Sequence, residues 1–353
     1  MKKMKVGIIG TGNLAELHMK AYRKNPDVEI VAVCDFNLER AKQRAEQFGA
    51  KEVYQDYKDM LSKSDIDAVS VITWNNTHAE ITVNALNAGK HVLCEKPPAL
   101  NALQALEMEK ASQSAGKLLM FGFVRRFEEK AKLLKQKIDD GELGDIYYIK
   151  TGYLRRTGNP GGWFANKKIS GGGPLIDLGV HMVDLAMFLM NKPKPVSVFG
   201  ATFNKVGNMA NIKGVSAWKA ADYRNDGIND VEDMAVGIIK FENGSCIHLE
   251  TSWTSHIKKD VTYLEVFGSK GGASLEPDLE IYTADRSYLT DIKPVLKSGF
   301  DFDACFSEEI DHFVDCVLRG TPCTCSAKDG VTIMKILDAI YASSETGQLI
   351  EVK

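Results

Sequence analysis

The opening stretch KVGIIGTGNLAELH, at residues 5–18, constrains the fold more than any other part of the chain. A short apolar run leads into two glycines and then into a helix-forming segment, in the order Gly10-x-Gly12-x-x-Ala15. Gly10 permits a tight turn, Gly12 lets a phosphate approach the backbone, and Ala15 lets the helix pack closely on the strand. The free N–H groups and the dipole of the helix N-terminus then favour an anion. The pattern predicts a strand–turn–helix unit that binds a dinucleotide.

A second apolar run, residues 29–34, ends at Asp35, which lies 23 residues after Gly12. A carboxylate about 20 residues after the glycine turn typically accepts hydrogen bonds from the adenosine ribose of NAD. The same carboxylate repels the 2′-phosphate of NADP, although Arg40, the nearest cation, would soften that preference. We therefore predict NAD as the cofactor, with NADP less favoured. The alternative is that Asp35 merely ends a strand.

The first third of the chain alternates between strand-like and helical patterns. This alternation predicts a parallel sheet with helices on both faces, which is an α/β Rossmann domain over residues 1–122. Asn101 and Gly116 are expected to cap the last of its helices. The predicted strands are 5–10, 29–34, 66–73, 90–94 and 117–122, and the predicted helices are 13–24, 37–48, 56–63, 77–88 and 101–115.

The pattern changes after about residue 123, where long strands begin to follow one another. Successive strands joined by hairpins, such as the one signalled by Asn243-Gly244, indicate an antiparallel sheet and an α+β domain over 123–353. Residues 207–230, rich in Asn, Gly and Asp, are expected to form a long loop near the active site. The predicted strands are 145–155, 196–206, 232–242, 245–254, 261–268 and 272–276, and the helices are 128–139, 175–190, 306–318 and 327–345.

The composition is that of an ordinary globular protein, with 44% hydrophobic and 26% charged residues among 353. The net charge of −3 argues against a nucleic-acid partner, and no apolar run is expected to approach the length of a membrane span. Seven cysteines are scattered along the chain, and the single close pair, Cys323-x-Cys325, is a poor zinc signature. We expect a reduced, cytoplasmic protein without a structural metal.

Two further motifs carry chemistry. Lys96 follows the strand 90–94, and ligands of open α/β sheets bind beyond the carboxyl ends of the strands. Taken alone, a lysine before a proline is usually a surface residue. Asp177 and His181 are four residues apart within an apolar helix, so they would share one helix face. The alternative is a buried histidine that is satisfied by its neighbouring carboxylate.

Four motifs together resemble the glucose–fructose oxidoreductase / inositol dehydrogenase / rhizopine catabolism family, and the resemblance covers nearly the whole chain. It implies a Rossmann domain joined to an open-faced, mainly antiparallel sheet, with dimers or tetramers formed through the sheet. It also implies hydride transfer between a nicotinamide cofactor and a secondary alcohol of a sugar or cyclitol. The motifs are GIIGTGNLAELH at 7–18, Thr73-x-Asn75-x-x-His78, GKHVLCEKP at 89–97 and GGGPLIDLGVHMVDL at 171–185.

The resemblance assigns roles to individual residues. Lys96 resembles the family's active-site lysine, His181 its acid/base histidine and Asp177 the carboxylate that assists it. The Lys96–Pro97 bond is often cis in the family. Trp74 stands where relatives often have proline, so it either stacks on a ligand or packs in the core. The expected cofactor-binding residues are Gly10, Gly12, Asn13, Leu14, Asp35, Thr73, Trp74, Asn75, His78, Glu95 and Lys96.

Two residues, Arg126 and Trp163, are weaker candidates for substrate contact, and a salt bridge is at least as good an interpretation of Arg126. In the expected mechanism His181 takes the hydroxyl proton and Lys96 stabilises the developing alkoxide. Two alternatives stay open: oxidation followed by elimination that cleaves a glycoside, and a non-catalytic dinucleotide sensor. Retention of Lys96, Asp177 and His181 argues against the sensor. Substrate specificity is expected in the loops 155–170, 207–230 and 253–260.

Overall fold

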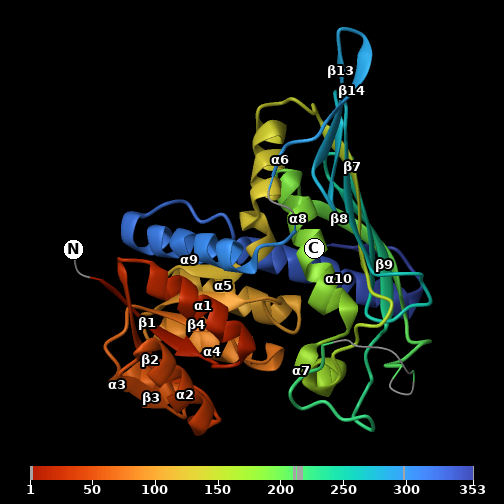
Figure 1. The fold of residues 1–353 in the computed structure, drawn as a ribbon. Coiled ribbons are helices and arrows are strands. Elements are labelled where there is room, and N and C mark those ends of the chain that lie inside the picture. Colours follow the sequence, from red (N-terminus) through yellow and green to blue (C-terminus); the bar gives the residue numbers. More distant parts are fainter. Residues whose placement is uncertain (1–2, 210–211, 213–217, 297–298, 353) are drawn as a thin grey trace. The chain divides into compact units, whose positions relative to one another are not determined.

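A parallel sheet of six strands forms the amino-terminal part of the computed structural model, which describes residues 3–209, 212, 218–296 and 299–352 (Figure 1). The strand order is β3-β2-β1-β4-β5-β6, which is the Rossmann order. From β1 the chain adds strands toward one edge of the sheet as far as β3, and from β4 it adds them toward the other edge. The sequence predicted this sheet but missed the three-residue β3. The strands are β1 (Met4–Ile9), β2 (Val28–Cys34), β3 (Glu52–Tyr54), β4 (Ala68–Val71), β5 (His91–Glu95) and β6 (Leu119–Gly122).

The crossover helices begin and end at residues suited to those positions. Asn37, Asp56 and Asn101 each accept a backbone N–H at the start of a helix, as N-caps do. Gly49 and Gly116 end their helices in the left-handed conformation, so the predicted caps of the last helix are confirmed. The helices are α1 (Asn13–Lys24), α2 (Leu38–Phe48), α3 (Tyr57–Lys63), α4 (Asn75–Asn87) and α5 (Ala102–Ala115).

A nine-stranded sheet follows, ordered β14-β13-β12-β11-β7-β10-β9-β8-β15. Its strands pair antiparallel except for β7 with β10, so the predicted, mainly antiparallel sheet is confirmed. The sequence did not predict β13, β14 or β15. The strands are β7 (Ile146–Leu154), β8 (Pro195–Phe203), β9 (Met234–Phe241), β10 (Cys246–Ser252), β11 (Val261–Gly268), β12 (Gly272–Glu276), β13 (Glu280–Asp285), β14 (Tyr288–Ile292) and β15 (Ile350–Glu351).

Helices α6 and α8 pack on one face of this sheet (Figure 1). Side chains along β9 alternate between that buried face and an exposed one, as a strand covered on one side requires. The described part of the predicted loop 207–230 contains neither helix nor strand, and residues 210–211 and 213–217 lie outside the described residues. The helices are α6 (Glu129–Asp139), α7 (Lys167–Ser170), a π-helical turn (Leu175–Gly179), α8 (Val180–Leu189), α9 (Phe302–Arg319) and α10 (Ala327–Thr346).

The chain divides into two compact units that differ from the predicted domains 1–122 and 123–353. The first unit contains residues 1–127 and 301–331, and the second contains 128–300 and 332–353. Helix α9 joins the first unit because it packs against α1, where the rings of His18 and Phe306 have centroids 5.3 Å apart. This long-range packing leaves no mark on the local sequence pattern.

The hairpin between β9 and β10 forms where Asn243-Gly244 predicted it, but its turn is longer than expected. Phe241 donates its N–H to the carbonyl of Ser245 at 3.0 Å, which leaves residues 242–244 as a three-residue loop. Gly244 has φ of +85°. Three-residue hairpin loops commonly place a left-handed residue at this position.

One helical stretch, Lys167–Leu189, is long and apolar enough to cross a membrane by length and composition, contrary to the sequence expectation. Its most apolar window has a mean hydropathy of 1.3, but 83% of that window is buried inside the protein. Burial of this kind is typical of a core helix under a sheet, so we interpret the stretch as part of the second unit's core.

Candidate nucleotide and substrate sites

The glycine turn of the first unit is shaped to receive a phosphate. Gly10 has φ of +91°, and a Cβ there would overlap the carbonyl oxygen of Ile72. Gly12 precedes α1 and offers no capping side chain, and a Cβ built on it would meet nothing within 4 Å. The N-terminus of α1, with Asn13 and Leu14 in its first turn, therefore faces open space, as an anion site at a helix N-terminus requires.

Asp35 lies at the carboxyl end of β2 and is held by several donors. Its Oδ2 accepts hydrogen bonds from the backbone N–H of Thr11 at 2.8 Å and from the Thr11 hydroxyl at 2.9 Å. The guanidinium of Arg40 donates to Oδ1 at 2.7 Å and to Oδ2 at 2.9 Å. Burial alone raises the pKa of Asp35, but the hydrogen bonds from Arg40, Thr11 and Asn37 outweigh it and lower that pKa. Asp35 is therefore a carboxylate at neutral pH.

Two exposed aromatic rings stand beside this carboxylate. Phe36 follows β2 and is 65% exposed, and Trp74 follows β4 and is 38% exposed. Their ring centroids are 5.7 Å apart, and the Arg40 guanidinium lies 5.3 Å from the Phe36 ring. Large exposed rings at the end of a parallel sheet suit stacking on a flat ligand ring. The sequence singled out Trp74 as a candidate but not Phe36.

The loop that carries Lys96 is fixed by Glu95. One carboxylate oxygen of Glu95 accepts the Lys96 backbone N–H at 3.1 Å, and the other lies 2.7 Å from Nε2 of the buried His18. Gly122 pairs with Glu95 across the sheet, and a Cβ on Gly122 would lie 3.0 Å from the Glu95 carboxylate. Glu95 thus positions the Lys96 backbone from inside the protein. The Lys96–Pro97 bond is cis, as the resemblance implied.

His78 connects the loops that follow two neighbouring strands. Its Nδ1 lies 2.8 Å from the carbonyl oxygen of Pro97, and its Nε2 lies 3.2 Å from that of Thr73. The imidazole is buried, and this burial lowers the pKa of His78 despite the two carbonyls. Asn75 is also buried, at the start of α4. His78 therefore acts here as a brace between the Thr73 and Lys96 loops.

In the second unit, Asp177 and His181 do not lie on one regular α-helix as predicted. Asp177 sits in the π-helical turn Leu175–Gly179, and His181 lies in the first turn of α8. The Asp177 carboxylate accepts a hydrogen bond from Nε1 of the buried Trp253 at 3.0 Å. The π-turn changes the angular relation between the two side chains, because it has more residues per turn than an α-helix.

The glycine run before this turn is required by packing. The N–H of Gly173 donates to a carboxylate oxygen of Glu232 at 2.9 Å, and the Leu175 N–H donates to the other at 3.1 Å. A Cβ on Gly173 would overlap the Glu232 backbone, and one on Gly172 would overlap the Tyr341 hydroxyl. The run therefore fixes the start of the helical segment that carries Asp177.

The indole that contacts Asp177 belongs to an aromatic cluster, of which sequence reasoning found only part. Trp163 stacks on Phe164 with ring centroids 3.8 Å apart, and Phe164 meets Trp218 and Trp253 edge-on at 5.6 Å and 6.5 Å. Trp163 was a candidate, whereas Phe164, Trp218 and Trp253 were not. The available signal was that Trp163, Trp218 and Trp253 each lie within one of the predicted specificity loops.

Arg155 adds a cation close to this cluster. Its guanidinium lies 5.1 Å from the Tyr153 ring. Burial alone would lower the pKa of Arg155, but Tyr153 and Asp177 outweigh it and raise that pKa. The second unit thus combines apolar rings, a cation and carboxylate Asp177, which are groups suited to a polyhydroxylated ring.

Arg126 occupies a structural position within the first unit. It is 3% exposed, and its guanidinium donates to Oδ2 of Asp329 at 3.0 Å and to the carbonyl oxygen of Thr324. The sequence left open a surface or interdomain salt bridge for Arg126, and the structure instead shows a buried one within a single unit.

Comparison with known proteins agrees with these features. A family model described as "Oxidoreductase family, NAD-binding Rossmann fold" matches residues 4–123, and one described as "GFO/IDH/MocA C-terminal domain" matches residues 131–274. The chain is 36% identical to a D-glucoside 3-dehydrogenase of Escherichia coli K12, over 99% of this chain and 97% of the relative. It is 26% identical to a myo-inositol 2-dehydrogenase of Thermotoga maritima, over 99% of each.

Solved structures share the fold over the whole chain. An oxidoreductase domain protein from Kribbella flavida has a TM-score of 0.88 at 25% identity, with all of both chains covered. A levoglucosan dehydrogenase in complex with NADH has a TM-score of 0.87 at 24% identity, again with all of both chains covered. The protein is therefore an oxidoreductase enzyme of the GFO/IDH/MocA family, with an NAD-binding Rossmann domain followed by the family's carboxyl-terminal domain.

Proposed function

We propose that this enzyme oxidises a secondary hydroxyl group of a sugar, a sugar derivative or a cyclitol, with NAD⁺ favoured over NADP⁺. The observation that carries the proposal is the 36% identity to a D-glucoside 3-dehydrogenase over nearly the full length of both chains. The buried carboxylate of Asp35 supports the choice of NAD, since its negative charge opposes a 2′-phosphate.

The residues of the first unit fit a dinucleotide. The open N-terminus of α1 suits the pyrophosphate, Asp35 suits the ribose hydroxyls, and Phe36 and Trp74 suit the flat adenine ring. When bound, the nicotinamide supplies the hydride acceptor. Glu95 and His78 hold the loop that presents Lys96.

Each of three side chains has a proposed part in the chemistry. The Lys96 ammonium stabilises the negative charge that develops on the substrate oxygen, which is commonly the largest catalytic contribution. The His181 imidazole accepts the hydroxyl proton, because an imidazole has an ordinary pKa of about 6.5 and exchanges protons readily near neutral pH. Asp177, fixed by the Trp253 indole, orients His181 or accepts a neighbouring substrate hydroxyl.

A substrate screen tests the proposed activity. Purified enzyme is mixed with NAD⁺ and with alkyl glucosides, free aldoses, polyols or inositols, and NADH is followed by absorbance. We expect NADH to accumulate with at least one glycoside or cyclitol, and mass spectrometry to find the matching ketone. Sugar cleavage without net NADH would instead indicate oxidation followed by elimination. Cofactor binding without any turnover would indicate a sensor.

Substitutions test the assigned roles. Lys96→Ala and His181→Ala should each lower kcat by about 10²-fold or more. Lys110→Ala, an exposed lysine of α5, is the matched control and should leave turnover unchanged. Near-normal turnover by both active-site variants would refute the assignment.

We further propose that the enzyme works in the cytoplasm as a homodimer or homotetramer that associates through the large sheet of the second unit. The exposed apolar side chains on that sheet support self-association.

A further inference from the structure

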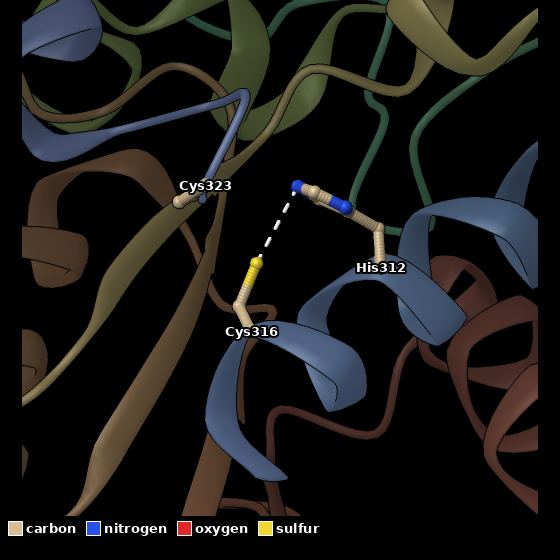
Figure 2. Close-up of side chains that lie close together, drawn as sticks. All are labelled: His312, Cys316 and Cys323. Carbon is tan, nitrogen blue, oxygen red and sulfur yellow. Dashed lines mark hydrogen bonds between the residues drawn. The ribbon is translucent and has the colours of Figure 1, made fainter. Parts of the chain in front are cut away.

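A histidine and two cysteines gather at the end of α9, outside the residues used above. His312 and Cys316 are four residues apart on this helix, so they share one face (Figure 2). Gly320 caps the end of α9, and its φ of +70° turns the chain back and brings Cys323 against the same face. All three residues are half-buried, so solvent reaches them.

The distances among the donor atoms match those of a metal site. His312 Nε2 lies 3.5 Å from Cys316 Sγ. A ring nitrogen of His312 and the Sγ atoms of Cys316 and Cys323 all lie within 4.8 Å of one another. With Zn–S of about 2.3 Å and Zn–N of about 2.0 Å, a tetrahedral zinc ion places its nitrogen and sulfur ligands about 3.5 Å apart. A zinc ion thus fits between these donors with small side-chain adjustments.

The donors are held in place by their surroundings. The His312 ring packs against Phe127, with ring centroids 5.6 Å apart, and its Nε2 accepts the backbone N–H of Thr324 at 3.1 Å. That bond requires an unprotonated Nε2, which is the form that binds metal ions, and a cation would take over its lone pair from Thr324.

The segment carrying Cys323 is tied to the Rossmann sheet. The backbone N–H of Phe121 donates to the carbonyl of Cys325 at 3.0 Å, and Met120 forms an antiparallel bridge with Ser326. The buried Arg126 donates to the carbonyl of Thr324 in the same segment. A metal held jointly by α9 and this segment would therefore fasten α9 to the edge of the sheet at β6.

We propose that His312, Cys316 and Cys323 form a zinc site with three protein ligands and a fourth position for water. Two thiolates and one imidazole form a soft donor set that selects zinc over magnesium or calcium. The three ligands hold α9 and residues 320–326 together, so the ion stabilises this part of the first unit.

Metal binding is measured on the full-length enzyme, purified under reducing conditions and stripped with a chelator. Cobalt(II) is the first probe, because thiolate ligands give it an intense ultraviolet charge-transfer band. We expect wild-type enzyme to show this band with one equivalent of cobalt per chain and to lose it when zinc is added. We also expect the enzyme to melt at a higher temperature with zinc than without it. Elemental analysis should then find one zinc per chain.

Variants identify the ligands. Cys316→Ser, Cys323→Ser and His312→Gln should each weaken cobalt binding at least tenfold and abolish the thermal shift. Cys246→Ser, a half-buried cysteine of β10 in the second unit, is the matched control and should bind as wild type does. Circular dichroism checks that each variant folds. If a cysteine variant does not fold, His312→Gln still tests the metal site.

Three results would overturn the proposal. One is a reduced wild-type enzyme that gives no thiolate–cobalt band. Another is a band that persists unchanged in Cys316→Ser. The third combines two measurements: the intact mass shows a Cys316–Cys323 disulfide, and the enzyme still takes up no zinc after that disulfide is reduced. This result would identify the two cysteines as a redox couple.

Discussion

At the scale of single residues, the proposed preference for NAD over NADP depends on the pairing of Asp35 with Arg40. Arg40 forms a hydrogen bond with each oxygen of the Asp35 carboxylate, and its side chain is 35% exposed. While Asp35 is present, its charge neutralises the guanidinium and repels a 2′-phosphate. Without it, the same guanidinium would be free to bind that phosphate.

We therefore predict that Asp35→Ser shifts the preference toward NADP. Hydrogen bonds to charged groups contribute about 1.5–3 kcal/mol, so the ratio of kcat/KM for NADP⁺ to that for NAD⁺ should rise about tenfold or more. Steady-state kinetics with both cofactors measures the ratio. Adding Arg40→Ala to the variant should abolish the gain, and an unchanged ratio in Asp35→Ser would disprove the role of the pair.

We expect His91 to make the first unit less stable in acid. Its Nδ1 accepts the backbone N–H of Leu118 at 3.1 Å, and burial lowers the pKa of His91. The unfolded chain, with an ordinary histidine pKa of about 6.5, therefore binds more protons than the folded chain just below that pH. Stability from this group is present above pH 6.5 or so and is lost as the pH falls through the folded pKa.

The variant His91→Asn places an amide oxygen near the position of Nδ1 but cannot take up a proton. We expect the free energy of unfolding to fall less between pH 7.5 and pH 5.5 in this variant than in wild type. Urea titrations at both values measure the difference. His78, whose pKa is also lowered, leaves a residual dependence of the same sign in both proteins. Equal losses in the two proteins would exclude a contribution from His91.

Residues that follow a strand directly were predictable, whereas residues brought in by tertiary packing were not. Asp35 follows β2 and was located by counting from the glycine turn, and Lys96 follows β5 and was located by its place after a predicted strand. The indole partner of Asp177 comes from residue 253, far along the chain, and no spacing links the two. The sequence did not predict the cluster of His312, Cys316 and Cys323. A helix end and a turn separate the first two residues from Cys323, so no short ligand spacing links all three.

At the scale of secondary-structure elements, segments with a clear periodicity of apolar residues were predicted with nearly correct bounds. Segments without such a periodicity were missed. Strands β11 and β12 lie at the predicted bounds, because buried and exposed side chains alternate along them. The edge strand β14 is largely exposed, so it carries no such alternation. The π-helical turn at 175–179 has the composition of an α-helix, so the local sequence did not distinguish the two.

The β9–β10 hairpin gives an element-scale prediction through Gly244. A Cβ at this residue would meet nothing within 4 Å, so substitution acts only through the left-handed backbone. Gly244→Ala should lower the free energy of unfolding by about 1 kcal/mol, whereas Gly244→Asn should cost less because asparagine tolerates this conformation. Urea unfolding of the two variants measures this order, and equal losses would contradict the assigned turn.

At the scale of the whole molecule, the outer face of the large sheet bears on assembly. Phe199 on β8 and Ile238 on β9 are paired across the sheet and are 49% and 46% exposed. Phe203 on the same strand is 40% exposed. Apolar patches of this kind mark interaction surfaces in soluble proteins. Because a sheet face can pack on a second copy of itself, we take this face as the proposed contact between subunits.

The double variant Phe199→Lys with Ile238→Glu tests that contact while keeping a favourable cross-strand pair within the subunit. Burying one phenylalanine or isoleucine side chain stabilises a contact by about 1.5–3 kcal/mol, so losing both from each subunit should dissociate the oligomer. Light scattering coupled to size-exclusion chromatography measures the mass. We expect a dimer or tetramer for wild type and a smaller species for the variant. Leu289→Glu, on the exposed β14, should keep the wild-type mass. A monomeric wild type, or a variant of unchanged mass, would place any self-association elsewhere.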